Sequence, residues 1–127
     1  MKLSKFIVYF AAGFFILYGL AFTIVPNVMS VLITGSDITG TSALIDFRAT
    51  YGGMTLAVGI MILYLDRINQ KRPSLVMVIL LLMGMALGRT LGFWIDGRGN
   101  ALMYVYLVLE ILGSVLAFVA LQKEKSA

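Results

Sequence analysis

The stretch LVMVILLLMGMALGRTLGFWIDGRG, residues 75–99, decides the fold of this chain. Residues 75–95 form an apolar run that, at about 1.5 Å per residue in a helix, is long enough to cross a hydrocarbon core of about 30 Å. Gly84, Gly88 and Gly92 recur every four residues, a spacing typical of close helix contact in membranes. Arg89 lies among them, and a permanent positive charge inside such a run requires a partner.

The composition of the whole chain is that of a membrane protein. Of its 127 residues, 61% are hydrophobic and 13% are charged, and the mean hydropathy is +0.99. A soluble domain usually has charge on about a quarter of its residues. The chain has no cysteine and no histidine, so it lacks disulfides, thiolate ligands and the commonest general base. We therefore expect a single domain over residues 1–127 with no metal site and no cofactor.

Three further runs resemble residues 75–95 in length and character. The expected membrane spans are residues 6–25, 44–65, 75–95 and 101–121. Pro26 ends the first run, which is too long for the apolar core of a signal peptide. The predicted fold class is all-α, an integral membrane bundle of four transmembrane helices. The connection over residues 26–43 is partly apolar, which fits a short helix lying at the membrane interface.

The positive residues outside the spans are divided unequally between the two sides of such a bundle. One side holds Lys2, Lys5, Arg67, Lys71, Arg72, Lys123 and Lys125. The other side holds Arg98, in the turn after the third span. Because cytoplasmic loops carry the excess of lysine and arginine, we expect both termini in the cytoplasm. This topology accounts for the net charge of +4, so membrane lipid is an expected partner and nucleic acid is not.

Three ionisable residues lie at depth within the expected spans: Arg48, Arg89 and Glu110. Each costs about 2.5–3.5 kcal/mol at a helix centre on insertion scales, so such residues usually face the bundle interior. All three fall in the outward half of their spans. Helical phase gives them neighbours that are polar, aromatic or small: Tyr51, Gly52 and Thr55 beside Arg48, Phe93 beside Arg89, and Tyr106 and Gly113 beside Glu110.

We predict that these side chains converge on one site. The expected ligand-binding residues are Arg48, Tyr51, Thr55, Arg89, Phe93, Tyr106 and Glu110. The three ionisable groups sum to one positive charge, which suits an anionic or zwitterionic head group of a small amphipathic molecule or lipid. The expected packing residues are Gly52, Gly84, Gly88, Gly92 and Gly113. Of these, Gly84, Gly88 and Gly92 form a glycine seam that would contact this chain, a second copy or another membrane partner.

Two other functions fit the same residues. In the first, the chain is an enzyme whose Glu110 is the catalytic acid and base for isomerisation or cyclisation of an apolar substrate, with Tyr51 or Tyr106 assisting. No known catalytic motif supports this interpretation, so we lean against an enzyme. In the second, the chain is a structural or accessory subunit that binds its partner through the glycine seam. The pair of Arg89 and Glu110 would then only fix helix register.

The segments FRATYGGMTLAVGI (47–60) and GRTLGFWIDG (88–97), with Glu110 in the last span, also carry a resemblance. Together they resemble small bacterial membrane proteins of domain-of-unknown-function family 4345, in the neighbourhood of the DoxX-like group. The resemblance covers nearly the whole chain and implies four helices in a bacterial inner membrane. It points to Arg48, Tyr51, Gly52, Gly53, Gly88, Arg89, Gly92, Asp96, Gly97 and Glu110. It implies no activity, so the three functions remain open.

Overall fold

The structure is a computed structural model that describes residues 2–124. Its elements are α1 (Lys2–Ile24), α2 (Pro26–Thr34), α3 (Thr41–Phe47), the π-helix η1 (Arg48–Met54), α4 (Thr55–Arg67), α5 (Lys71–Ile95) and α6 (Ala101–Lys123). The described residues contain no β-strand. Lys125, which the sequence placed among the cytoplasmic charges, lies outside the described residues.

Four helices are long and apolar enough to cross a membrane, which confirms the predicted fold class. They are Leu3–Ile24, Thr41–Arg67, Lys71–Ile95 and Ala101–Lys123. The second is built from α3, η1 and α4 in direct succession. The sequence predicted no π-helix within it.

Local sequence signals account for the ends of the helices. Pro26 occupies the first turn of α2, where its missing N–H group costs no hydrogen bond. Gly35 ends α2 in the left-handed conformation, with φ of 78°, and its N–H donates to the carbonyl of Val31. At the start of α6, the side chain of Asn100 accepts a hydrogen bond from the N–H of Met103. These signals fix a short α2 and a tight turn between α5 and α6.

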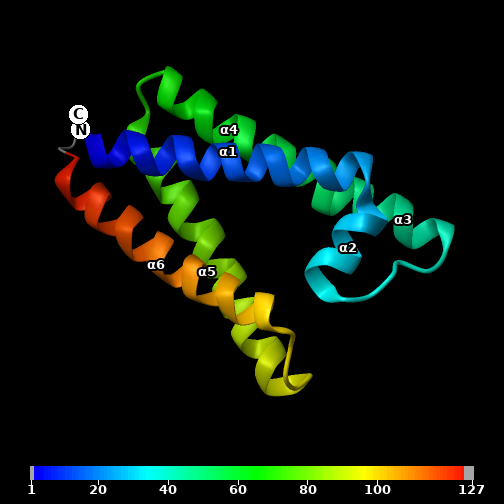
Figure 1. The fold of residues 1–127 in the computed structure, drawn as a ribbon. Coiled ribbons are helices and arrows are strands. Elements are labelled where there is room, and N and C mark those ends of the chain that lie inside the picture. The colour runs from blue at the N-terminus through cyan, green and yellow to red at the C-terminus, as the bar shows by residue number, and fades with distance from the viewer. Residues whose placement is uncertain (1, 125–127) are drawn as a thin grey trace.

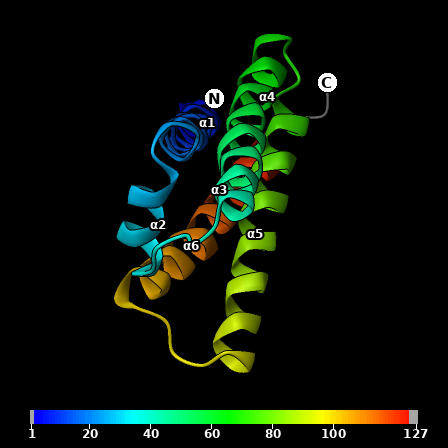
Figure 2. The ribbon, with the colours of Figure 1, turned by 90° about the vertical axis from the view of Figure 1, so that its right-hand side faces the viewer.

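The helices form two pairs that meet at one end of the molecule and diverge toward the other (Figure 1). One pair consists of α1 packed along α4 and η1, and the other of α5 packed along α6. Both chain ends lie where the pairs meet (Figure 1). At the diverging end, α2 runs from α1 toward the start of α6 (Figure 2). There the side-chain amide of Asn100 donates to the carbonyl of Ile33 at 2.7 Å, which links the two pairs.

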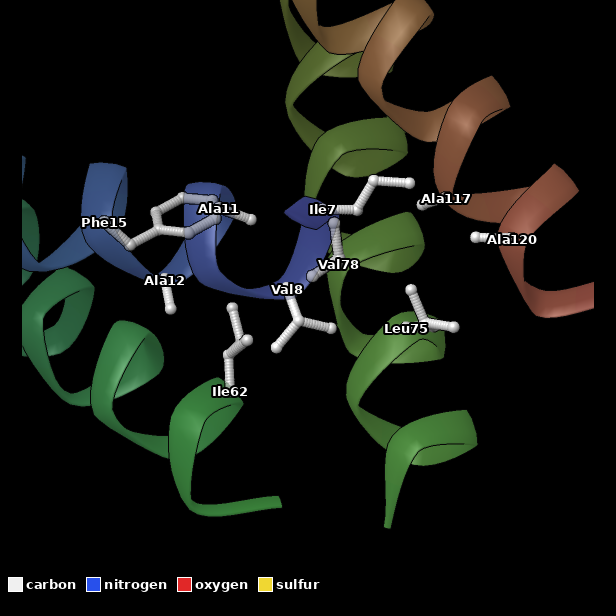
Figure 3. Close-up of a cluster of buried hydrophobic side chains, with 10 residues drawn as sticks. All are labelled: Ile7, Val8, Ala11, Ala12, Phe15, Ile62, Leu75, Val78, Ala117 and Ala120. Atoms are coloured by element: carbon white, nitrogen blue, oxygen red, sulfur yellow. The ribbon is translucent and has the colours of Figure 1, made fainter. Parts of the chain in front are cut away.

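The hydrophobic core lies at the meeting end and draws on all four spans (Figure 3). Its residues are Ile7, Val8, Ala11, Ala12, Phe15, Ile62, Leu75, Val78, Ala117 and Ala120. Ile62, Leu75 and Val78 are fully buried. The hydroxyl of the buried Ser74 donates to the carbonyl of Ile62 at 3.1 Å and so ties α5 to α4. Because this core fixes the helices at one end, their other ends are held mainly by contacts within each pair.

Glycine permits the closest helix contact, which is between α1 and the second span. A Cβ atom at Gly59 would lie 2.9 Å from the carbonyl oxygen of Ala12. One at Gly52 would lie 2.9 Å from the backbone nitrogen of Thr23. Real Cβ atoms are not found so near a backbone, so only glycine fits at these positions. Such close backbone approach is a main source of helix association in membranes.

The glycine seam of Gly84, Gly88 and Gly92 takes no part in this contact between α1 and the second span. Nothing in the described residues comes within 4 Å of a Cβ placed at Gly84 or Gly88, and Gly92 meets only Asp96 of its own turn, at 3.7 Å. The expectation that these glycines pack α5 against this chain is therefore wrong. A four-residue spacing does not distinguish a helix face turned toward the bundle from one turned toward lipid. Contact with a second copy or another partner stays a prediction.

The two sets of glycines should respond differently to alanine. We expect Gly59→Ala to lower the free energy of unfolding by about 1–3 kcal/mol, because the new methyl group overlaps the backbone of α1. Gly88→Ala should leave it unchanged or raise it by up to about 1 kcal/mol, because alanine favours a helix and meets nothing. Unfolding in mixed detergent micelles, followed by circular dichroism, measures both. Equal destabilisation by the two variants would contradict this packing.

Candidate functional site

Arg89 of α5 and Glu110 of α6 form a bidentate ion pair inside two membrane spans. Nη2 of Arg89 lies 2.6 Å from Oε1 of Glu110, and Nε lies 3.1 Å from Oε2. The side chain of Glu110 is 5% exposed and that of Arg89 is 19% exposed. Two parallel charge-assisted hydrogen bonds fix both distance and orientation. The sequence predicted that Arg89 points toward Glu110 but left open which carboxylate each arginine meets, and the structure pairs these two residues directly.

Three neighbours shape the surroundings of the ion pair. The guanidinium carbon of Arg89 lies 5.3 Å from the ring centroid of Tyr106, in the range of a cation–π interaction. Nη1 of Arg89 donates to Sδ of Met103 at 3.0 Å. One turn beyond Glu110, a Cβ atom at Gly113 would lie 2.8 Å from Cδ1 of Leu82, so glycine there allows α5 and α6 to approach. This close approach keeps both ion-pair hydrogen bonds short.

Tyr18 of α1 also belongs to this neighbourhood, although the sequence analysis did not select it. It lies within electrostatic range of Tyr51, Arg89, Tyr106 and Glu110. Tyr18 is thus a residue of α1 in the wider surroundings of the ion pair. The sequence did contain a signal, because aromatic residues recur at helical spacing along this face of α1. They are Phe14, Phe15, Tyr18 and Phe22.

Aromatic contacts connect Tyr18 to the second span. Its ring lies 4.9 Å from that of Phe22, and the ring of Phe22 lies 5.4 Å from that of Tyr51. Tyr51 also stacks on Phe47 at 4.7 Å. Tyr51 remains 46% exposed, so one side of this aromatic row is open to the surroundings of the protein.

The side chain of Arg48 binds the carboxyl end of α1 and does not pair with Glu110. Its Nη1 donates to the carbonyl of Thr23 and, at 3.1 Å, to that of Ile24. The last carbonyls of a helix lack partners within it and carry a partial negative charge, so a nearby guanidinium is stabilised there. The prediction that Arg48 shares a pocket with Arg89 and Glu110 is therefore wrong. The extra positive charge predicted for the site is absent with it.

Two other predicted ligand-binding residues make contacts of their own. The hydroxyl of Thr55 donates to the carbonyl of Thr50 at 3.4 Å, within the second span. The ring of Phe93 stacks on that of Tyr104, with centroids 4.4 Å apart. The structure thus gathers Arg89, Tyr106 and Glu110 and gives the remaining predicted residues local partners.

The π-helix η1 contains the RATYGGM segment, residues 48–54. Single π-helical turns within α-helices are frequent at functional sites, because they alter the direction of side chains locally. Here the segment carries Arg48 at the end of α1, Tyr51 in the aromatic row and Gly52 in the close contact with Thr23. These three contacts with α1 hold the second span against it.

The described residues contain no group of three or more acidic side chains placed to hold a metal ion. Two surface depressions lie away from the ion pair. One, of about 370 Å³, is lined by residues of α2 and the segment that follows it, namely Asn27, Val28, Val31, Leu32 and Asp37. The other, of about 290 Å³, lies on α6 beside Tyr104, Val105, Val108 and Leu109.

Comparison with known proteins identifies a family. Residues 3–121 match the family described as Domain of unknown function (DUF4345). No curated protein and no solved structure matches the chain.

The role assigned to Arg48 is testable by stability. Arg48→Gln should lower the free energy of unfolding in micelles by about 1 kcal/mol, because the charge is lost from the carbonyl end of α1. Arg98→Gln, a substitution in the exposed turn before α6, is the matched control and should leave stability unchanged. If both substitutions are neutral, Arg48 does not stabilise the end of α1.

Proposed function

The chain belongs to the family described as domain of unknown function DUF4345, and we propose that it binds a small amphipathic molecule or a lipid head group at Arg89 and Glu110. The observation that carries this proposal is the bidentate ion pair inside the spans. A buried ion pair contributes little net stability, so its presence calls for another role. Recognition of a polar head by groups held within the bilayer is such a role.

The surroundings of the pair suit an amphipathic ligand. The rings of Tyr18 and Tyr106 offer apolar faces, and their hydroxyls can donate hydrogen bonds to a polar head. A tail would lie along the apolar side chains of the diverging helices. The ligand would therefore place each of its parts against groups of matching polarity.

The arrangement of the helices supports entry from the bilayer. α5 packs on α4, yet makes no extensive contact with α3 or η1 toward the diverging end (Figure 1). On the other side, α2 links α1 to α6 (Figure 2). We propose that a lipid-like molecule approaches from the side where Tyr51 is exposed.

The structure bears differently on the two alternative functions, the enzyme and the accessory subunit. Both carboxylate oxygens of Glu110 accept one hydrogen bond from Arg89, and each keeps a second lone pair. The ion pair therefore gives no specific support to Glu110 as a catalytic acid or base. The outward-facing Gly84 and Gly88 are instead compatible with an accessory subunit that binds its partner there. The experiment below separates that role from ligand binding.

The four spans indicate a membrane-embedded protein, and we propose the bacterial inner membrane with both termini in the cytoplasm. Two observations support this orientation. Both chain ends lie at the same end of the bundle (Figure 1), and the positive residues outside the spans are concentrated there. In this orientation the ion pair lies in the outward half of the membrane.

The proposal predicts a bound molecule that depends on the ion pair. Protein released from native-like lipid discs and studied by native mass spectrometry should retain a discrete lipid-sized adduct. Glu110→Gln should reduce the occupancy of that adduct at least about tenfold, because Arg89 loses its orienting partner. Arg48→Gln, which removes an arginine outside the site, should leave the occupancy unchanged.

The exchanged variant Arg89→Glu with Glu110→Arg separates recognition from structure. It retains the pair of charges, so we expect it to recover stability relative to either single change but to bind the adduct poorly. Recovery of both the stability and the adduct binding would mean that the pair only fixes the register of α5 against α6. Wild-type protein without any adduct, combined with disulfide-linked dimers of Gly88→Cys, would favour the accessory subunit.

A further inference from the structure

One donor of Arg89 has a weak partner. Nε and Nη2 donate to the two carboxylate oxygens of Glu110, while Nη1 donates to the thioether sulfur of Met103 at 3.0 Å. A thioether is a poor hydrogen-bond acceptor compared with an oxygen atom. Methionine is also unbranched and changes rotamer readily. An oxygen atom of a ligand could therefore replace the sulfur on Nη1 without disturbing the ion pair.

The charge balance limits which oxygen atom would bind there. The bidentate pair of Arg89 and Glu110 is neutral as a unit, and Arg48 is held by the carbonyls at the end of α1. An anionic head would bring an uncompensated charge into a low-dielectric site, at a cost that a neutral head avoids. A neutral carbonyl oxygen still gains a charge-assisted hydrogen bond from the guanidinium.

We infer that Nη1 of Arg89, at the position now held by the sulfur of Met103, recognises an uncharged carbonyl oxygen, such as an ester oxygen, in the head of an amphipathic ligand. The inference rests on the proposed function and specifies its ligand class. Further hydroxyl groups of the same head would find hydrogen-bond donors and acceptors in the hydroxyls of Tyr18 and Tyr106. The best ligand is thus a neutral, ester-bearing and hydroxyl-bearing lipid, in place of the anionic or zwitterionic head expected from the sequence.

The test uses three probes with hydrocarbon chains of the same length and unsaturation. Monoolein has an ester carbonyl and no charge, oleyl alcohol has no carbonyl, and oleoyl lysophosphatidic acid has the ester and a negative charge. Equilibrium binding of each radiolabelled probe to the full-length protein in a non-ionic detergent gives three dissociation constants. Monoolein should bind at least about tenfold more tightly than either of the others, because it alone combines an ester carbonyl for Nη1 with an uncharged head.

Two substitutions of Met103 then test the position itself. Met103→Gln supplies an amide oxygen from the protein, which would occupy Nη1 and weaken monoolein binding about tenfold or more. Met103→Leu removes the sulfur at similar volume, so monoolein should bind as tightly as to wild type, or more tightly. Both variants keep Arg89 and Glu110. Should either variant fail to fold, the order of the three probes on the wild-type protein still decides the question.

The outcomes separate this inference from the proposed function. If oleyl alcohol or the lysophosphatidic acid binds as tightly as monoolein, or if Met103→Gln binds monoolein like wild type, the inference is overturned. The proposed function survives that result when Glu110→Gln still abolishes the binding observed. If wild-type protein binds none of the probes and carries no native adduct, both fail.

Discussion

An ionisable side chain within the bilayer must find a partner, and this constraint organises one half of the molecule. Arg89 and Glu110 satisfy each other through two hydrogen bonds, which fixes the register of α5 against α6. Gly113 lets the two helices come close enough for those bonds to stay short. Breaking such a pair would leave a buried charge at a cost of about 3–5 kcal/mol, so α5 and α6 are held together at a defined position.

The other half of the molecule is organised by close backbone contact. Gly52 and Gly59 bring the second span against α1, and the guanidinium of Arg48 binds the last carbonyls of that helix. The two rigid pairs share a core only where the chain ends meet (Figures 1 and 3). The ion pair lies beyond this core along α5 and α6. The ion pair joins the two helices of the α5–α6 pair, and it is the polar group at which we propose that a ligand from the membrane binds.

The sequence predicted the features that a lipid environment requires, such as span length and partners for charges. It did not predict which way individual residues face. Span lengths and the meeting of Arg89 with Glu110 followed from hydropathy, depth and helical phase, because few alternatives can satisfy an isolated charge in a membrane. Arg48 had such an alternative, since the carbonyl end of a neighbouring helix serves as its partner. Gly84 and Gly88 carry the spacing of a packing motif but face away from the chain, and spacing alone does not give a direction. The π-helix depends on tertiary contacts that periodicity does not encode. Tyr18 lies in a row of aromatic residues at helical spacing, but the spacing does not show that the row leads toward the ion pair.

The central claim is that Arg89 and Glu110 contact each other inside the membrane, and solid-state NMR in lipid bilayers tests it directly. The sample would carry ¹⁵N-labelled arginine and glutamate labelled with ¹³C at its carboxylate, and a Glu110→Gln sample would distinguish Glu110 from Glu124. The structure predicts strong dipolar coupling between guanidinium nitrogens and the carboxylate carbon of Glu110, which the substituted sample lacks. Absence of that coupling in wild-type protein, together with contacts between the Arg89 guanidinium and lipid acyl chains, would contradict the account.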